Sequence, residues 1–107
     1  MILGALGGSV IISAVLQTIL NIVDFGMSPM EAVSVPRIHS EGDFVHVEAR
    51  VESSQIAVLE SFGHKIKKSP YSFDPMMARC HVILKDKKNW KAGADPRSGG
   101  GVAFARV

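Results

Sequence analysis

The first twenty residues of the chain, MILGALGGSVIISAVLQTIL (residues 1–20), place two adjacent glycines, Gly7 and Gly8, directly before a long apolar run. Polar residues interrupt this run and its continuation at spacings of four, four, four and three: Ser9, Ser13, Gln17, Asn21 and Asp24. This narrow polar stripe predicts an amphipathic helix over about residues 8–25, with Gly26 just past its end. Because its apolar face is wide, we expect the helix to be buried in a protein core.

The composition is that of one globular domain. The chain has 107 residues, of which 47% are hydrophobic and 21% charged, and we expect a single domain over residues 1–107. The formal net charge of +2 is too small to indicate a nucleic-acid partner. Seven lysines gather late in the chain, and we interpret them as solvated strand edges that resist pairing with other strands: Lys65, Lys67, Lys68, Lys85, Lys87, Lys88 and Lys91.

The sequence predicts neither a disulfide nor a metal site nor a membrane segment. Cys80 is the single cysteine, and we expect its thiol to be inert because it lies in an apolar strand. The four histidines show no ligand spacing. The N-terminal apolar run carries too many polar residues for a lipid-spanning helix, and no basic segment precedes it as in a signal peptide. These patterns leave the localisation open, and the chain as it stands is expected to be cytoplasmic.

The remaining patterns predict an α+β fold with helices packed on an antiparallel sheet. Ser28, Pro29 and Glu31 form a capping box that starts a short second helix, which Pro36 ends. Strict alternation predicts a strand over residues 44–51 with one buried face. A third helix is expected from about residue 54 to 62, with Gly63 as its stop. Further strands are expected over residues 65–68, 79–85, 90–93 and 102–107.

The glycine pair admits two interpretations. Residues 1–6 are expected to form a strand that leads into it, so the pair is explained by a tight strand-to-helix turn alone. Alternatively, glycines at a helix start let an anionic oxygen approach backbone N–H groups that have no helical partner. The spacing of Gly4, Gly7 and Gly8 does not match the dinucleotide-binding pattern, and no phosphate-loop lysine follows. The pattern alone favours the turn.

Five motifs, in order, give the whole sequence a family resemblance. They are GALGGSVII (residues 4–12), NIVDFGM (21–27), AVSVPRIH (32–39), GH (63–64) and ADPR (94–97). With these motifs the chain resembles the C-terminal part of the small subunit of γ-glutamyltranspeptidases, a family that includes related cephalosporin acylases. The resemblance covers essentially all 107 residues.

The resemblance implies a fold and a reaction. The fold is the four-layer αββα sandwich of the N-terminal nucleophile hydrolases, of which this chain would form a part. The family cleaves itself into two subunits and uses the newly exposed threonine to attack a γ-glutamyl amide, with no metal and no organic cofactor. Paired glycines before the long helix donate backbone N–H groups to the oxyanion. The corresponding catalytic and substrate-binding residues in this sequence are Gly7 and Gly8.

Two departures from the family pattern bear on function. Leu6 stands where the family usually has proline, which leaves the turn less constrained. The nucleophilic threonine and the residues that hold the substrate lie upstream in the family; Thr18, the only threonine here, is expected in mid-helix. We therefore interpret the chain as a C-terminal fragment that is inactive alone. The alternative is a truncated or stand-alone non-catalytic homologue that serves as an anion-binding or interaction module.

The implied partners follow from this interpretation. A γ-glutamyl substrate is expected only in the context of the complete enzyme. The remaining parts of the parent fold, or self-association through the first helix, are expected to cover the apolar surface of the chain.

Other motifs have structural interpretations. Arg37 is expected to pair with a carboxylate, and Asp95 to bond to its own turn. His46 and Glu48 share a strand face and are expected to be ordinary surface residues.

Overall fold

The computed structural model describes residues 1–106 and has two three-stranded sheets in that range. The first sheet contains β1 (Ile2–Leu6), β5 (Arg79–Asp86) and β6 (Asn89–Gly93), ordered β1-β5-β6 and antiparallel throughout. The second contains β2 (Ile38–Ser40), β3 (Phe44–Val47) and β4 (Lys65–Lys68). The pair β3–β4 is parallel because α3 (Ser53–Ser61) carries the chain back between them. The predicted α+β class is confirmed, with this one parallel pair added.

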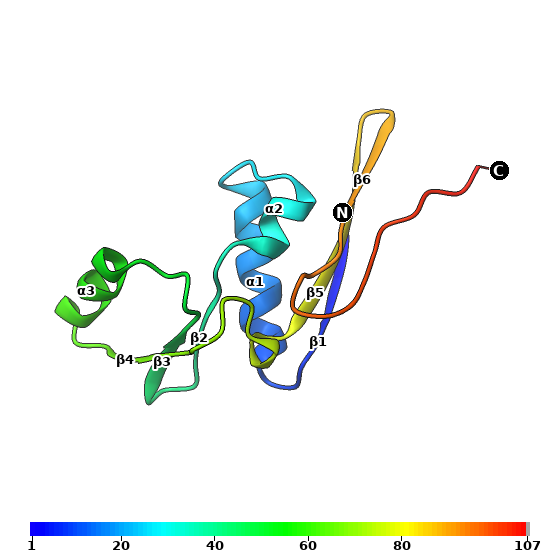
Figure 1. The fold of residues 1–107 in the computed structure, drawn as a ribbon. Helices are drawn as coiled ribbons and strands as arrows, with labels where there is room; N and C mark the ends of the chain where they lie inside the picture. Colours follow the sequence, from blue (N-terminus) through cyan, green and yellow to red (C-terminus); the bar gives the residue numbers. More distant parts are fainter. Residues whose placement is uncertain (107) are drawn as a thin grey trace.

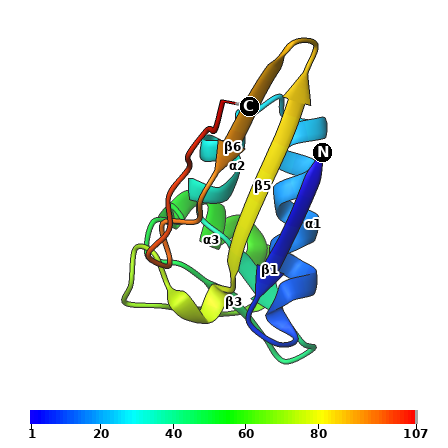
Figure 2. The same cartoon turned by 90° about the vertical axis from the view of Figure 1, so that its right-hand side faces the viewer.

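Two helices cover one face of the first sheet. Helix α1 (Val10–Val23) and the short α2 (Pro29–Ser34) contact β5 and lie between the two sheets (Figure 1). Figure 2 shows the opposite face of β1, β5 and β6 with no helix in front of it. The core between helices and sheet contains Val33, Cys80 and Val82, which pack with Leu3, Ala5 and Ile22.

A second, smaller core lies between α3 and the second sheet. Val45, Val47 and Val51 form it with three residues of α3 and β4: Ile56, Leu59 and Ile66. The predicted alternation is therefore correct for this face. The strand itself ends at Val47 rather than at residue 51, because the chain then turns and the Val51 N–H donates to the Glu48 carbonyl at 3.0 Å.

In two segments of the C-terminal half the structure differs from the prediction. The three-residue 3₁₀ helix η1 (Pro75–Met77) precedes β5 and was not predicted. The strand predicted over residues 102–107 is wrong for residues 102–106, which are irregular and run away from the sheet in Figure 1. Alternating apolar residues there find no partner strand. Residue 107 lies outside the described residues.

Helix α1 is oriented differently from the prediction. Its polar stripe faces the protein: Gln17 Nε2 donates to the Ile38 carbonyl at 2.7 Å, and Asn21 Nδ2 donates to the Ala32 carbonyl at 3.2 Å. The side chains that lie fully buried are Ala14 and Thr18. A second stripe is exposed, and we call it the outer helix stripe: Ile12, Leu16, Leu20 and Val23. The expectation that the apolar face is buried therefore fails for this stripe.

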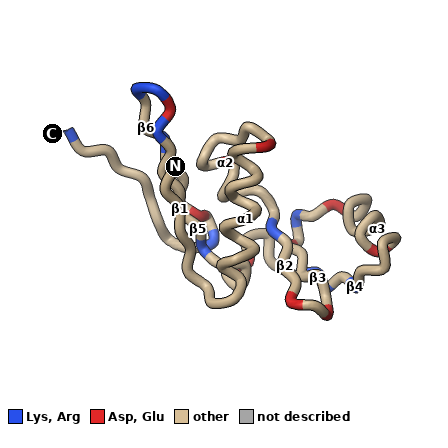
Figure 3. The backbone as a smooth tube through the Cα atoms, turned by 180° about the vertical axis from the view of Figure 1, so that it is seen from behind, with Lys and Arg blue, Asp and Glu red and all other residues tan. Residues whose placement is uncertain are grey.

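The charged side chains lie mostly at the periphery. Figure 3 shows a group of lysines at the β5–β6 hairpin, and the lysines of β4 lie on the edge strand of the second sheet. All seven late lysines are exposed, which confirms that they are solvated. Among residues 1–106, no helix is long and apolar enough to cross a membrane.

We expect the outer helix stripe to drive self-association of the chain, because several large apolar side chains lie together in water. Sedimentation velocity over a range of concentrations should show dimers or larger species. The variant Ile12→Gln/Leu16→Gln should shift the distribution towards monomer. Val58→Gln, which alters a half-exposed valine of α3, serves as the matched control and should change nothing. A wild-type chain that sediments as a monomer at high concentration would contradict this expectation.

Candidate functional site

The two adjacent glycines are required for two different reasons. Gly7 has φ +140°, and a Cβ at this position would lie 2.9 Å from the Cα and Cβ of Ala78. No side chain fits there. Gly8 has φ +69°, which is the left-handed region, and nothing lies within 4 Å of the place of its missing Cβ. One glycine therefore permits a close backbone approach, and the other forms the turn and leaves its outer side open.

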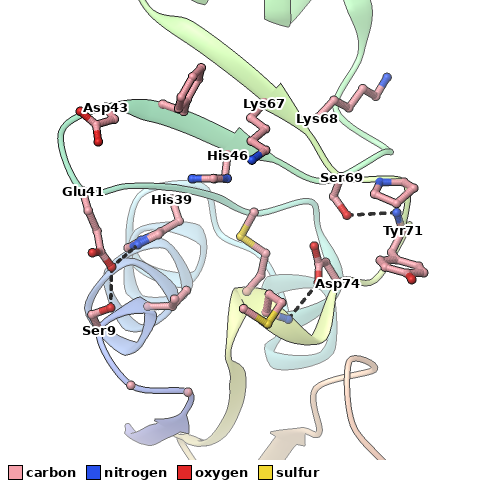
Figure 4. Close-up of a pocket in the computed structure, with 17 residues that line it drawn as sticks. Ser9, His39, Glu41, Asp43, His46, Lys67, Lys68, Ser69, Tyr71 and Asp74 are labelled. Carbon is pink, nitrogen blue, oxygen red and sulfur yellow. Dashed lines mark hydrogen bonds and ion pairs between the residues drawn. The ribbon is translucent and has the colours of Figure 1, made fainter.

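A cavity of about 870 Å³ opens beside this turn. Gly7, Gly8 and Ser9 line one side, and residues of β3, β4 and the following loop line the other. Figure 4 shows His46 and Lys67 above the cavity and Asp74 beside it. A cavity of this size accommodates a small organic ligand or a short peptide. The structure thus places the predicted site residues Gly7 and Gly8 at the wall of this cavity.

Four hydrogen-bonded side chains connect the start of α1 to β2 and to the turn after it, and we call them the Glu41 cluster: Ser9, Ser13, His39 and Glu41. The Ser9 hydroxyl donates to Glu41 Oε1 at 2.5 Å. The same oxygen lies 2.9 Å from His39 Nε2 (Figure 4), and His39 Nδ1 lies 2.7 Å from the Ser13 hydroxyl. The bonds from Ser9 and then from His39 lower the pKa of Glu41, so its carboxylate is ionised.

The turn that leads into α1 keeps three backbone N–H groups available. In residues 1–106, no hydrogen bond uses the backbone N–H of Gly7, Gly8 or Ser9. Ser9 occupies the N-cap position, but its side chain caps no amide of the helix. The start of a helix also carries partial positive charge. The turn can therefore donate hydrogen bonds to an anionic oxygen that enters from the cavity.

A buried charge cluster, consisting of Arg37, Glu48, Asp95 and Arg97, supports the wall behind the glycine turn. Arg37 Nη1 lies 2.6 Å from Asp95 Oδ2, and Arg97 Nη1 lies 3.1 Å from Asp95 Oδ1. Arg97 also donates from Nε to Glu48 Oε2 at 2.8 Å and from Nη2 to Glu48 Oε1 at 2.5 Å. All four side chains are at most 5% exposed. Each buried charge therefore has an opposite charge in direct contact.

This buried charge cluster also fixes Ala78, the residue that Gly7 touches. Ala78 has φ +65° and ψ +177°, a conformation that is strained for any residue with a side chain. Arg37 Nη1 donates to the carbonyls of Met77 and Ala78, each at 3.3 Å. The cluster thus holds the strained segment against the glycine turn.

Two predictions about these residues are confirmed and one is wrong. Arg37 pairs with a carboxylate as expected, and Asp95 accepts the Arg97 N–H within its own turn at 2.9 Å. Glu48, expected on the surface, is 0% exposed. Its carboxylate points inward because it accepts hydrogen bonds from Arg97 and from the backbone N–H groups of Arg37 and Asp74.

Protonation in this region follows burial and charge. Burial alone would raise the pKa of Asp95, but the N–H groups of Cys80 and Arg97 and the Arg37 guanidinium outweigh it, and the pKa is lowered. Burial raises the pKa of the Cys80 thiol. Cys80 is fully buried, which agrees with the prediction that it is inert. In the part of the chain that the structure describes, no three His, Cys, Asp or Glu residues are grouped to hold a metal ion.

The similarity of the chain to known proteins covers nearly its whole length. The gamma-glutamyltranspeptidase family model matches residues 1–105. The chain belongs to the γ-glutamyltranspeptidase family. The resemblance inferred from the five motifs is therefore confirmed.

Named relatives and solved structures of this family are much longer. Glutathione hydrolase proenzyme 1 of Schizosaccharomyces pombe is 38% identical over 82 residues, which are 73% of this chain and 13% of the relative. The Escherichia coli glutathione hydrolase proenzyme is 35% identical over 100 residues, 92% of this chain and 17% of the relative. The structure of cephalosporin acylase from Bacillus halodurans superposes with a TM-score of 0.88 at 28% identity, covering 98% of this chain and 20% of that one. The expected likeness to N-terminal nucleophile hydrolases is thus confirmed, and the chain spans a fifth or less of each of these proteins.

We expect Arg97→Met to lower the free energy of unfolding by about 3–5 kcal/mol, because it leaves buried carboxylates without their partner. Urea unfolding of the 107-residue chain measures this. Lys91→Met is the matched control, since Lys91 forms an exposed pair with Asp86 at 3.8 Å. The control should change stability by less than about 0.5 kcal/mol. Equal effects of the two substitutions would show that the buried charge cluster contributes no more to the free energy of unfolding than an exposed ion pair does.

We also expect the chain to lose stability in acid through Asp95. Because its folded-state pKa lies below its ordinary value, the stabilisation is fully present above about pH 4 and disappears as the pH falls through the folded-state pKa. Urea unfolding at pH 7 and at pH 3 measures the difference. Asp95→Asn should reduce stability at pH 7 and flatten its fall with acid, whereas Asp86→Asn, at an exposed position, should leave the fall unchanged. If the stability of Asp95→Asn fell between pH 7 and pH 3 as much as that of the wild type, Asp95 would not be the cause of the loss.

Proposed function

We propose that the chain is the C-terminal segment of a γ-glutamyltranspeptidase-type enzyme, and that Gly7 and Gly8 donate backbone N–H groups to the oxyanion formed during acyl transfer. The observation that carries this proposal is the pair of free N–H groups at the cavity wall in a chain of this family. The substrate would be a γ-glutamyl amide, as the name glutathione hydrolase implies for the relatives.

The geometry of the turn suits this role. Attack on an amide carbonyl moves negative charge onto its oxygen, and fixed N–H donors stabilise that charge without having to reorganise. Gly8 has open space on its outer side, and the start of α1 adds the positive end of the helix dipole. The contact of Gly7 with Ala78 fixes the backbone that presents these donors.

Leucine in place of the family's usual proline is compatible with this turn. Leu6 is the last residue of β1 and pairs in register with Arg79 of β5. The strand ladder on one side and the Gly7–Ala78 contact on the other hold the chain at this point. The backbone is therefore fixed by its neighbours, and the φ restriction that proline supplies is not needed.

The nucleophile must come from outside these 107 residues. Thr18, the only threonine, is fully buried, and its hydroxyl donates to the Ala14 carbonyl at 2.8 Å. Acyl transfer also requires a base and an anchor for the acyl donor. We propose that other parts of the enzyme supply all three, which agrees with the much greater length of the relatives.

Those other parts would also cover apolar surface that the chain leaves exposed. Besides the outer helix stripe, the bare face of the first sheet carries exposed side chains from all three of its strands: Ile2, Leu6, Ile83 and Trp90. In a four-layer αββα sandwich this face would pack on a second sheet. We propose that the face and the stripe are interfaces within the complete enzyme.

We expect Gly8→Val to abolish turnover in a hybrid in which residues 1–107 replace the corresponding part of the E. coli glutathione hydrolase proenzyme. Valine would place a branched side chain where the oxyanion binds, and loss of one such donor costs on the order of 10²–10³ in kcat in a serine protease. The measurement is release of a chromogenic anilide from its γ-glutamyl derivative.

Gly26→Val is the matched control, because Gly26 has nearly the same φ of +65°, also borders open space, and lies at the far end of α1. It carries the same backbone strain outside the site and should retain turnover. Turnover of Gly8→Val within a few-fold of the parent hybrid would reduce Gly8 to a turn residue. A parent hybrid that cleaves itself into two subunits but shows no turnover would favour the alternative that the chain comes from a non-catalytic homologue.

A further inference from the structure

We propose that Glu41 is a positioning residue that keeps the first turn of α1 open by drawing the Ser9 hydroxyl away from the helix. Its importance for catalysis rests on the function proposed above. The effect on the helix start, in contrast, can be tested in the chain itself, whatever that function is.

Ser9 lies at the N-cap of α1 but does not cap the helix with its side chain. A serine at a helix N-cap normally turns its oxygen back to accept the N–H of the second or third helical residue. Ser28 does so at the start of α2, where it has ψ +158° and accepts the Glu31 N–H at 3.2 Å. Ser9 holds the same position before α1, but its ψ is −24° and it accepts no amide.

The contacts of Ser9 explain this difference. Its hydroxyl donates to Glu41 Oε1 at 2.5 Å, 32 residues further along the chain. Glu41 is held in place in turn, because the same oxygen lies 2.9 Å from His39 Nε2 and the other ring nitrogen of His39 bonds to Ser13. The Glu41 side chain is otherwise 62% exposed. A hydroxyl can donate one hydrogen bond and accept another, as Ser28 does with the side chain and the amide of Glu31. Ser9 differs in the direction of its side chain, because the bond to Glu41 holds its oxygen where it accepts no helix amide.

The direction of the Ser9 side chain matters because the turn before α1 lies at the wall of the cavity. Gly8, Ser9 and Glu41 all line it. If the Ser9 hydroxyl were released, rotation of its backbone towards the extended region would let it cap the amide of Ile12, the third residue of α1. This rotation would also turn the peptide planes beside Gly8. With Glu41 in place, the amides stay directed at whatever oxygen enters the cavity.

Three variants distinguish a positioning role of Glu41 from a purely structural one. Glu41→Ala releases the hydroxyl and allows the cap to form. Glu41→Gln retains a side-chain oxygen that can accept the hydroxyl, so it should behave as the wild type. Ser9→Ala/Glu41→Ala removes the hydroxyl as well, so no cap can form even though the cluster is lost. A purely structural role of Glu41 would make the double variant at least as disturbed as the single one.

Amide hydrogen exchange in the 107-residue chain, measured by NMR, tests the pattern. In Glu41→Ala the Ile12 amide should exchange about fivefold more slowly than in the wild type, the ratio expected for a cap of about 1 kcal/mol. In Glu41→Gln and in Ser9→Ala/Glu41→Ala it should exchange at the wild-type rate. Ser28→Ala should accelerate exchange of the Glu31 amide, which verifies that the method detects a serine cap.

Turnover of the hybrid enzyme gives the second readout. Glu41→Ala should lower kcat at least tenfold with little change in KM, and adding Ser9→Ala should recover most of that loss. Unchanged or faster exchange at Ile12 in Glu41→Ala, or no recovery in the double variant, overturns the proposal. If the exchange pattern holds while Gly8→Val leaves turnover intact, the proposed function fails and the role of Glu41 at the helix start stands.

Discussion

The glycine turn depends on the pairing of two buried arginines with two buried carboxylates. Arg37 lies just before β2, Glu48 just after β3, and Asp95 and Arg97 after β6. Buried charges stabilise a fold only when each finds its partner and further hydrogen bonds, and here the guanidinium groups also bind the carbonyls of Val33, Val35, Met77 and Ala78. Four separate segments are thereby held in one arrangement. The strained Ala78, and the backbone that Gly7 must approach, are consequences of it.

Local patterns in the sequence predicted most of the elements, because their causes are local. The Ser28 cap of α2, the stop at Gly63 and the alternation of Val45 and Val47 each act within a few residues. The burial of Glu48 has no such cause, since Arg97 pairs with it from 49 residues away. Nothing in the alternation of residues 44–51 indicates that partner. The strand expected over residues 102–107 illustrates the opposite case. Its alternating sequence is local, but a strand also needs a neighbouring strand to pair with, and residues 102–106 have none.

The candidate site was predictable in its position but not in its parts. The glycine pair and the family motifs located it, and the structure then separated the two glycines into a contact with Ala78 and an open turn. The Glu41 cluster was missed. Its members come from two segments about 30 residues apart, and serine, histidine and glutamate at such a distance carry no spacing signal. The polar stripe of α1 did contain a clue, because Ser9 and Ser13 both belong to it.

The orientation of α1 bears on what surrounds the chain. In an isolated domain the polar stripe of a helix faces water and the apolar stripe faces the core. Here Ser13, Gln17 and Asn21 are directed at β2 and α2, where their hydrogen bonds fix how the helix sits. The outer helix stripe and the bare sheet face remain exposed to water. Both surfaces are apolar enough to require cover. In a four-layer αββα sandwich a second sheet would cover the bare sheet face, whereas the outer helix stripe would need cover from another part of the enzyme. Both exposed surfaces thus support the proposal that further parts of the enzyme pack on this chain and bring the nucleophile to the cavity beside Gly8.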